Sequence, residues 1–142
     1  MTPRPAPAFV LDEQLAGDTL VVGDLPLSRV LLMDDARFAW LILVPRLTEV
    51  REIFELSVHD QGRLMAEIAR CSERLKMLTG AAKINVGALG NLVPQLHVHV
   101  VARSAGDVAW PRPVWGYGKR QPYTESDRVT AVARLREALD LP

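Results

Sequence analysis

The fold is decided by one stretch of the chain, Gln95-Leu96-His97-Val98-His99-Val100-Val101. Polar and apolar side chains alternate along most of it, which is typical of a half-buried β-strand. Residues two apart on a strand point to the same face. We therefore expect the amide and both imidazoles on one face and the aliphatic side chains on the other. The aliphatic face should pack on the core, and the polar face should present a site.

The pair His97 and His99 has three interpretations. It can be ordinary surface polarity, a pair of ligands for a transition metal, or a centre for covalent catalysis with histidine as the nucleophile. A closed zinc site requires four ligands and an open one three. The sequence offers only His59 as a further histidine and Cys71 as its one cysteine. This shortage disfavours a metal site, and the residues upstream favour catalysis.

The segment before the strand, residues 84–94, contains two glycines and two asparagines. Gly87 and Gly90 allow positive φ and close approach of the backbone, so that N–H groups can face an anion. The amides of Asn85 and Asn91 can donate to phosphate oxygens without adding charge. A hairpin turn is the alternative interpretation of the two glycines. Their combination with two histidines favours an anion site.

From Asn85 to Val101 the sequence resembles the signature of the histidine triad (HIT) family. That signature is His-φ-His-φ-His-φ-φ, with φ apolar, preceded by an Asn or Gln and a Gly-Gln-Ser/Thr-Val loop. The resemblance extends from about residue 18 to residue 116. Four positions depart from the family: Gln95 replaces the first histidine, Asn91-Leu92 replaces the loop's Gln-Ser/Thr, and Trp40 stands where a partner histidine is common. We expect Trp40 itself to lie in the core.

The resemblance implies cleavage of nucleotides at the α-phosphate through a nucleotidyl-histidine intermediate. His97 takes the place of the middle triad histidine and is the expected nucleophile. A neutral imidazole attacks through one nitrogen when the other gives its proton to an acceptor. In the family this acceptor is the backbone carbonyl of the first motif residue, here Gln95, so the missing imidazole need not abolish attack. His99 is expected to contact the phosphate and protonate the leaving oxygen.

The resemblance also assigns residues that would hold the nucleotide. Asn85 matches the family's phosphate-contacting amide, and Asn91 with the backbone around Gly90 would add donors for developing charge. Asp34 matches the position that holds the ribose hydroxyls. A turn-forming role beside Asp35 is the alternative for Asp34.

Two classes of function follow. The first is a nucleotide hydrolase or nucleotidyl transferase acting on dinucleoside polyphosphates or substituted nucleotides. The alternative is a nucleotide-binding sensor or interaction module with little turnover, which Gln95, Leu92 and Trp40 favour; the retention of His97 and His99 favours the enzyme. Family resemblance implies a homodimer and no required cofactor, although Mg²⁺ could accompany a polyphosphate substrate.

Composition bounds the remaining possibilities. The 142 residues are 49% hydrophobic and 24% charged with zero formal net charge, which is ordinary for one globular domain. We expect a single domain over residues 1–142 with a Pro-rich, disordered tail over residues 1–7. Zero net charge and the lack of a long apolar run give no indication of nucleic-acid or membrane partners. A single cysteine excludes an internal disulfide, and we expect a cytoplasmic protein.

The pattern along the chain predicts an α+β fold with a mainly antiparallel, five-stranded sheet and two longer helices on one face. Strands are expected at residues 20–22, 29–33, 39–44 and 83–87 and along the motif, the third of them buried on both faces. Helices are expected from an N-cap near Asp60 to Gly80 and over residues 125–139, and a short helix or turn should dock near residues 9–15. If residues 83–87 pair antiparallel with the motif strand, Asn85 can lie beside His97.

Overall fold

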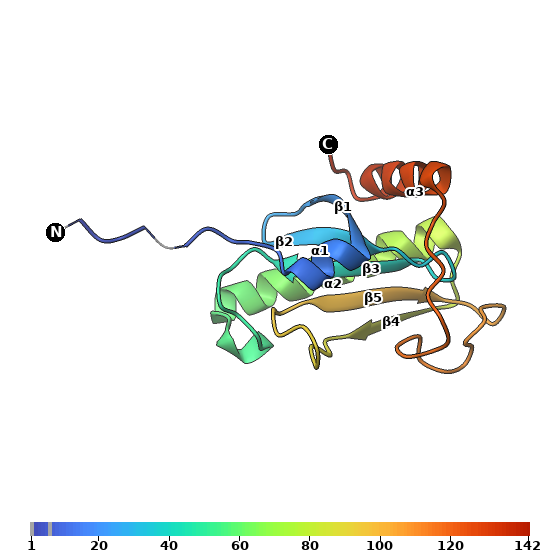
Figure 1. The fold of residues 1–142 in the computed structure, drawn as a ribbon, viewed down its shortest axis with the longest axis horizontal. Helices are drawn as coiled ribbons and strands as arrows, with labels where there is room; N and C mark the ends of the chain where they lie inside the picture. The colour runs from blue at the N-terminus through green and yellow to red at the C-terminus, as the bar shows by residue number, and fades with distance from the viewer. Residues whose placement is uncertain (1, 6) are drawn as a thin grey trace.

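The computed structural model describes residues 2–5 and 7–142 as one α+β fold built on a five-stranded antiparallel sheet (Figure 1). The strand order is β1-β2-β3-β5-β4. This confirms the predicted fold class. The strands are β1 Thr19–Asp24, β2 Ser28–Met33, β3 Trp40–Pro45, β4 Lys83–Gly87 and β5 Val98–Arg103.

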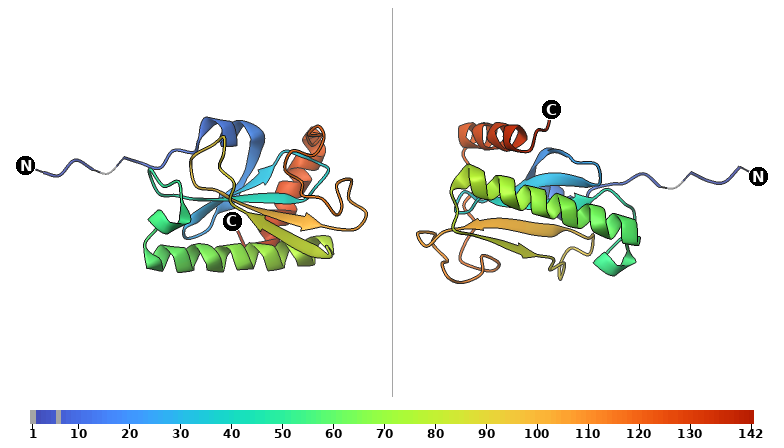
Figure 2. Two further views of the ribbon diagram at one scale, coloured as in Figure 1. Left: turned by 90° about the horizontal axis from the view of Figure 1, so that it is seen from below. Right: turned by 180° about the vertical axis from the view of Figure 1, so that it is seen from behind.

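Two longer helices accompany the sheet, as expected. The helix α2, Val58–Thr79, lies across one face of the sheet, and α3, Glu125–Ala138, packs beside β1 (Figure 2). The short α1, Glu13–Asp18, covers part of the opposite face, and a single 3-10 turn, η1, spans Ile53–Glu55. The predicted N-cap of α2 at Asp60 is wrong. The cap is Ser57, whose hydroxyl accepts from the Asp60 N–H, and the helix ends at Gly80 with φ +68°.

Alternation along the strands divides the core into two layers. Between the sheet and α2 lies a layer of aliphatic side chains, including Leu41, Leu43, Val98 and Val100 from the strands and Leu64, Ile68, Cys71 and Leu75 from the helix. On the other face a second layer contains Phe38, Trp40, Ile42, Val101 and Val114. Every residue of β3 is buried, which confirms the prediction of a strand covered on both faces.

The motif strand is shorter at its start than the alternation suggested. Gln95, Leu96 and His97 precede β5, and the Leu96 N–H donates to the Val50 carbonyl rather than to a strand partner. The two faces are nevertheless as predicted, because Leu96, Val98 and Val100 join the core layer beneath α2. His97 and His99 are therefore held on the face opposite α2.

The N-terminal end of the described chain lies outside the two core layers. Residues 2–5 are exposed and have no regular secondary structure, and in Figure 1 the N-terminal segment runs away from the body. The disorder expected over residues 1–7 falls partly on Met1 and Ala6, which lie outside the described residues. No helix among the described residues has the length and apolar character needed to cross a bilayer.

Candidate nucleotidyl-transfer site

His97 is oriented by the backbone just before it. Its Nδ1 lies 2.7 Å from the carbonyl oxygen of Gln95. A carbonyl can only accept, so Nδ1 must carry the proton and Nε2 keeps its lone pair. This hydrogen bond to the backbone carbonyl of the first motif residue is the contact predicted for His97. The imidazole is thereby prepared to act as a nucleophile through Nε2.

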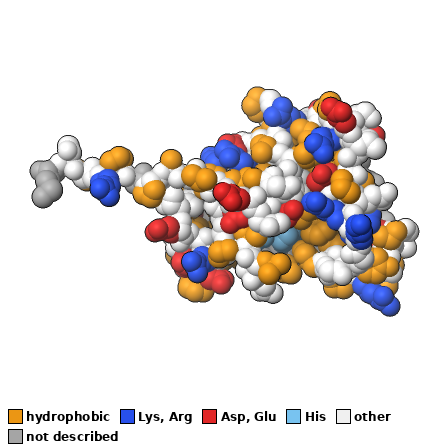
Figure 3. All heavy atoms as spheres, in the orientation of Figure 1, with side chains coloured by type: hydrophobic (Ala, Val, Ile, Leu, Met, Phe, Trp, Pro, Cys, Tyr) orange, Lys and Arg blue, Asp and Glu red, His pale blue; other side chains and the backbone are white. Residues whose placement is uncertain are grey.

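His97 lines a pocket of about 360 Å³ between η1 and the loop after β4. Residues before and within η1 form one wall and the glycine loop after β4 forms the other. Figure 3 shows a histidine side chain in the middle of the face opposite α2, among hydrophobic side chains. The lining residues are Arg51, Glu52, Ile53, Phe54, Ala88, Leu89, Gly90, Gln95, Leu96 and His97. The space suits a small ligand that reaches His97 from the loop side.

His99 has the opposite tautomer to His97. The indole Nε1–H of Trp40 donates to its Nδ1 at 2.9 Å. Indole is a donor only, so Nδ1 of His99 must be unprotonated and its proton must sit on Nε2. The rings of His97 and His99 lie 5.0 Å apart, edge to face. The site therefore holds one imidazole with a free Nε2 and a neighbour with an Nε2–H.

Burial keeps the His99 ring neutral. The side chain is 6% exposed, and desolvation, followed by the charge of neighbouring His97, lowers the pKa of His99 to about 4. Trp115 encloses it further, with ring centroids 5.5 Å from His99 and 6.2 Å from Trp40. His99 is thus a neutral hydrogen-bond donor at neutral pH.

A pH titration followed by nitrogen-15 NMR tests this state. We expect the His99 ring to keep a pyridine-like Nδ1 and a protonated Nε2 from about pH 8 to about pH 5, because its pKa is about 4. The unfolded chain takes up a proton near the ordinary value of 6.5, so the fold should lose stability as the pH falls from 6.5 toward 4. Surface-exposed His59 is the internal control. Protonation of His99 near pH 6.5 would contradict the assignment.

The Gln95 side chain bonds to the N-terminal segment, which the sequence did not indicate. Its Nε2–H donates to the Val10 carbonyl at 2.9 Å, and its Oε1 accepts from the Asp12 N–H at 2.9 Å. These two bonds fasten the N-terminal segment beside the motif, where Phe9, Leu11 and Leu15 join the second core layer. The Gln95 amide therefore holds the backbone of Val10 and Asp12 beside the motif.

Replacing Gln95 with alanine should release this segment without disabling His97. Two hydrogen bonds contribute about 1–3 kcal/mol together, so amide exchange at Asp12 should speed up roughly tenfold or more. Turnover should fall far less than in His97→Ala, because the Gln95 carbonyl remains. Gln14→Ala is the control, since the Gln14 side chain bonds to Asp18 within the same short helix. Unchanged exchange at Asp12 would refute this role of the Gln95 side chain. A loss of turnover equal to that of His97→Ala would show that the Gln95 side chain has a direct catalytic role.

Asn85 lies further from His97 than the sequence suggested. The strands pair antiparallel, but Asn85 lies opposite Val101 and Gly87 opposite His99, so the expectation that Asn85 lies beside His97 is wrong. Its Oδ1 accepts from Arg103 Nη1 at 2.9 Å. A guanidinium is only a donor, so this bond fixes the amide orientation and leaves Nδ2–H₂ as the donor end. The phosphate contact assigned to Asn85 stays a prediction.

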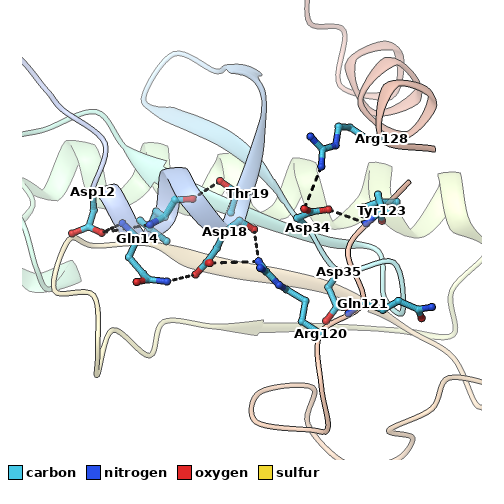
Figure 4. Close-up of polar contacts among 11 residues, drawn as sticks. Asp12, Gln14, Asp18, Thr19, Asp34, Asp35, Arg120, Gln121, Tyr123 and Arg128 are labelled. Atoms are coloured by element: carbon cyan, nitrogen blue, oxygen red, sulfur yellow. Dashed lines mark hydrogen bonds and ion pairs between the residues drawn. The ribbon is translucent and has the colours of Figure 1, made fainter. Parts of the chain in front are cut away.

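Asp34 is held by the C-terminal part of the chain. Its Oδ1 accepts from the Tyr123 N–H at 2.9 Å, and its Oδ2 lies 3.6 Å from Arg128 (Figure 4). Neighbouring Asp35 is buried and paired with Arg37 at 2.8 Å. Asp34 does not line the His97 pocket, so its ribose contact also stays a prediction.

The loop after β4 lines the His97 pocket with Ala88, Leu89 and Gly90, and its next two residues are exposed. Gly90 has φ +68°, a conformation that favours glycine, and it lines the His97 pocket. Asn91 is exposed beside it, and Leu92 is 96% exposed. At Gly87, an added Cβ would approach the Trp115 ring at 3.2 Å, so the absence of a side chain there permits Trp115 to close over His99.

A metal centre finds no support in the part of the chain that the structure describes. No group of three or more His, Cys, Asp or Glu side chains there could hold an ion. The pair His97 and His99 is engaged instead with the Gln95 carbonyl and the Trp40 indole.

Comparison with known proteins decides the family. The model of the HIT domain matches residues 14–106. The chain belongs to the histidine triad family. HIT proteins are generally nucleotide-binding hydrolases and transferases. No curated protein matches this HIT chain.

Solved HIT structures agree with the fold over nearly the whole chain. A histidine triad protein from Bradyrhizobium japonicum is 47% identical, with a TM-score of 0.91 over 94% of this chain and 99% of its own. One from Sinorhizobium meliloti is 50% identical, with a TM-score of 0.89 over 92% and 96%. One from Marinobacter aquaeolei is 47% identical, with a TM-score of 0.92 over 94% and 98%.

Proposed function

We propose that this HIT protein is a nucleotide hydrolase or nucleotidyl transferase that cleaves at the nucleoside α-phosphate through a nucleotidyl-His97 intermediate. The observation that carries the proposal is the 2.7 Å contact between His97 Nδ1 and the Gln95 carbonyl. This contact fixes the tautomer that leaves Nε2 free for attack. Dinucleoside polyphosphates and substituted nucleotides are the expected substrates.

The reaction has two halves. First, the Nε2 lone pair of His97 forms a bond to the α-phosphorus, and the bond to the leaving group breaks with its electron pair going to that group. The imidazole becomes cationic, and the Gln95 carbonyl stabilises the proton on Nδ1. In the second half, water attacks the phosphorus, the P–N bond returns its electrons to Nε2, and the water proton passes to solvent. The products are a nucleoside monophosphate and free enzyme.

His99 contributes a hydrogen-bond donor for the negative charge that develops on the phosphoryl oxygens. Its Nε2–H belongs to a ring packed between Trp40 and Trp115, so the donor is oriented before substrate arrives. A donor oriented in advance in a buried site stabilises an oxyanion more strongly than it would in water. Asn85, Gly90 and Asn91 are the further donors that we propose for phosphate, and Asp34 for the ribose.

The alternative function is a nucleotide sensor with little turnover. It is favoured by Asp34, because both oxygens of this carboxylate face partners inside the chain, the Tyr123 N–H and Arg128. Steady-state hydrolysis of a diadenosine polyphosphate, measured with and without Mg²⁺ beside a binding isotherm for AMP, separates the two. Turnover that releases AMP supports the enzyme, and tight binding without turnover supports the sensor. Absence of both would refute a nucleotide function.

A further inference from the structure

We infer that this site accepts only substrates whose leaving group departs from phosphorus as a stable anion, because the Trp40 indole holds His99 in its neutral Nε2–H form. Such leaving groups are phosphates, polyphosphates, carboxylates and acidic phenols. Amines, which must be protonated before they leave phosphorus, are excluded. This inference rests on the proposed function and narrows its substrate class.

Strand pairing places the indole against the ring. Trp40 lies opposite Val101 across the β3–β5 pair, and Ile42 lies opposite His99. Trp40 and His99 are therefore diagonal neighbours on one face of the sheet, within reach of a long aromatic side chain. The indole is 6% exposed and packs edge-on against Phe38 and Trp115, with centroids 6.3 and 6.2 Å away. The packing leaves the Nε1–H aimed at Nδ1 of His99.

A protonated His99 would have no place in this arrangement. Protonation would put a second N–H on Nδ1, directly facing the indole N–H at 2.9 Å, so that two donors would oppose each other. The hydrogen bond would be lost and a buried cation would lack a partner. The lowered pKa of His99 also favours the neutral ring. The ring can donate a hydrogen bond from Nε2, but giving the proton away would leave an imidazolate.

Neither His97 nor Arg51, which line the pocket, replaces His99 as a proton donor to the leaving atom. The Nδ1 proton of His97 is directed at the Gln95 carbonyl. Arg51 remains charged throughout any physiological pH range, since a guanidinium is not deprotonated in proteins. Glu52 lines the pocket from an exposed position before η1 and is the alternative acid that the experiment below would reveal. Without a general acid, the acidity of the leaving group decides the rate.

The test compares three AMP derivatives on the full-length protein: the p-nitrophenyl ester, the phenyl ester and an N-alkyl phosphoramidate. We expect turnover of the p-nitrophenyl ester, slower turnover of the phenyl ester, and a phosphoramidate rate lower by about 10²–10⁴-fold, the contribution that a general acid would make. A phosphoramidate rate within about tenfold of the p-nitrophenyl ester would overturn the inference. No reaction with any of the three, and no nucleotidyl adduct, would remove the proposed function as well.

Trp40→Phe tests whether the indole N–H is responsible. Trp40 is a positioning residue, and phenylalanine in its place keeps an aromatic ring but lacks the N–H that donates to His99. We expect the pKa of His99 to rise in nitrogen-15 NMR, both tautomers to appear, and the gap between ester and phosphoramidate to narrow at least tenfold. Trp110→Phe, which removes an indole N–H from a ring over Arg103, should change none of these. An unchanged His99 spectrum and an unchanged gap in Trp40→Phe would show that Trp40 does not set the substrate class.

Discussion

Replacing His97 with alanine should reduce nucleotidyl transfer by a factor on the order of 10⁴ or more, because it removes the atom that bonds to phosphorus. Neighbouring His99 cannot take its place, since its Nδ1 is occupied by the Trp40 indole and its Nε2 carries the proton. The fold should survive, because the imidazole bonds to the carbonyl of nearby Gln95 and to no distant element among the described residues. Single-turnover kinetics with the AMP p-nitrophenyl ester measure the loss, and thermal unfolding checks the fold.

His97→Gly is the matched control for the role of the imidazole. It leaves a cavity where the ring was, and added imidazole should bind there and restore part of the nucleotidyl transfer by acting as the nucleophile. His59→Ala should behave like the unaltered protein, because His59 is exposed at the start of α2. Full activity in His97→Ala, or its failure to fold, would refute the nucleophile assignment.

Replacing Arg103 with alanine should lower the free energy of unfolding by about 3–5 kcal/mol. Its guanidinium is 1% exposed and makes bonds to Asp107 at 2.8 Å, Asn85 at 2.9 Å and the Arg112 carbonyl at 2.6 Å. Alanine would leave the Asp107 carboxylate, the Asn85 amide oxygen and the Arg112 carbonyl without this donor, and would release the loop that carries Trp115 over His99. Urea denaturation measures the loss. Arg120→Ala, at an exposed ion pair with Asp18, should cost no more than about 1 kcal/mol.

The ion pair between Arg103 and Asp107 should make the free energy of unfolding depend on pH. Hydrogen bonding to Arg103 is the main cause that lowers the pKa of Asp107 from 3.8 to about 2. The carboxylate therefore stabilises the fold above about pH 4, by about 2 kcal/mol, and this contribution is lost as the pH falls toward 2. Asp107→Asn should be destabilised relative to the unaltered protein at pH 7 and nearly equal to it near pH 2. An equal deficit at both pH values would contradict this origin.

Local pattern was sufficient for the fold. The alternation around His97 and His99 predicted two distinct faces, and the continuous apolar run of β3 predicted burial on both sides. The bounds of β4 follow directly from residues 83–87. The exact starts of β5 and α2 did not follow, because each depends on which backbone group finds a partner, such as the Leu96 N–H on Val50.

The partners of the site residues were beyond the reach of local pattern. Gln95 bonds to Val10 and Asp12, more than eighty residues earlier, and Asn85 is oriented by Arg103. Trp40 was correctly expected in the core, but its hydrogen bond to His99 requires the register between β3 and β5. The signal that could have indicated it was the joint departure of Gln95 and Trp40 from the family pattern. A Trp in place of a His still supplies an N–H donor.

Intact-protein mass spectrometry after a brief incubation with the AMP p-nitrophenyl ester shows directly whether His97 becomes adenylylated. We expect an added mass of one adenylyl group on the unaltered protein, mapped to His97 by fragmentation and absent from His97→Ala. Gln95→Ala should retain the adduct, because the backbone carbonyl that orients His97 remains. Release of p-nitrophenol without any adduct, or an adduct on His99, would refute the nucleophilic role of His97.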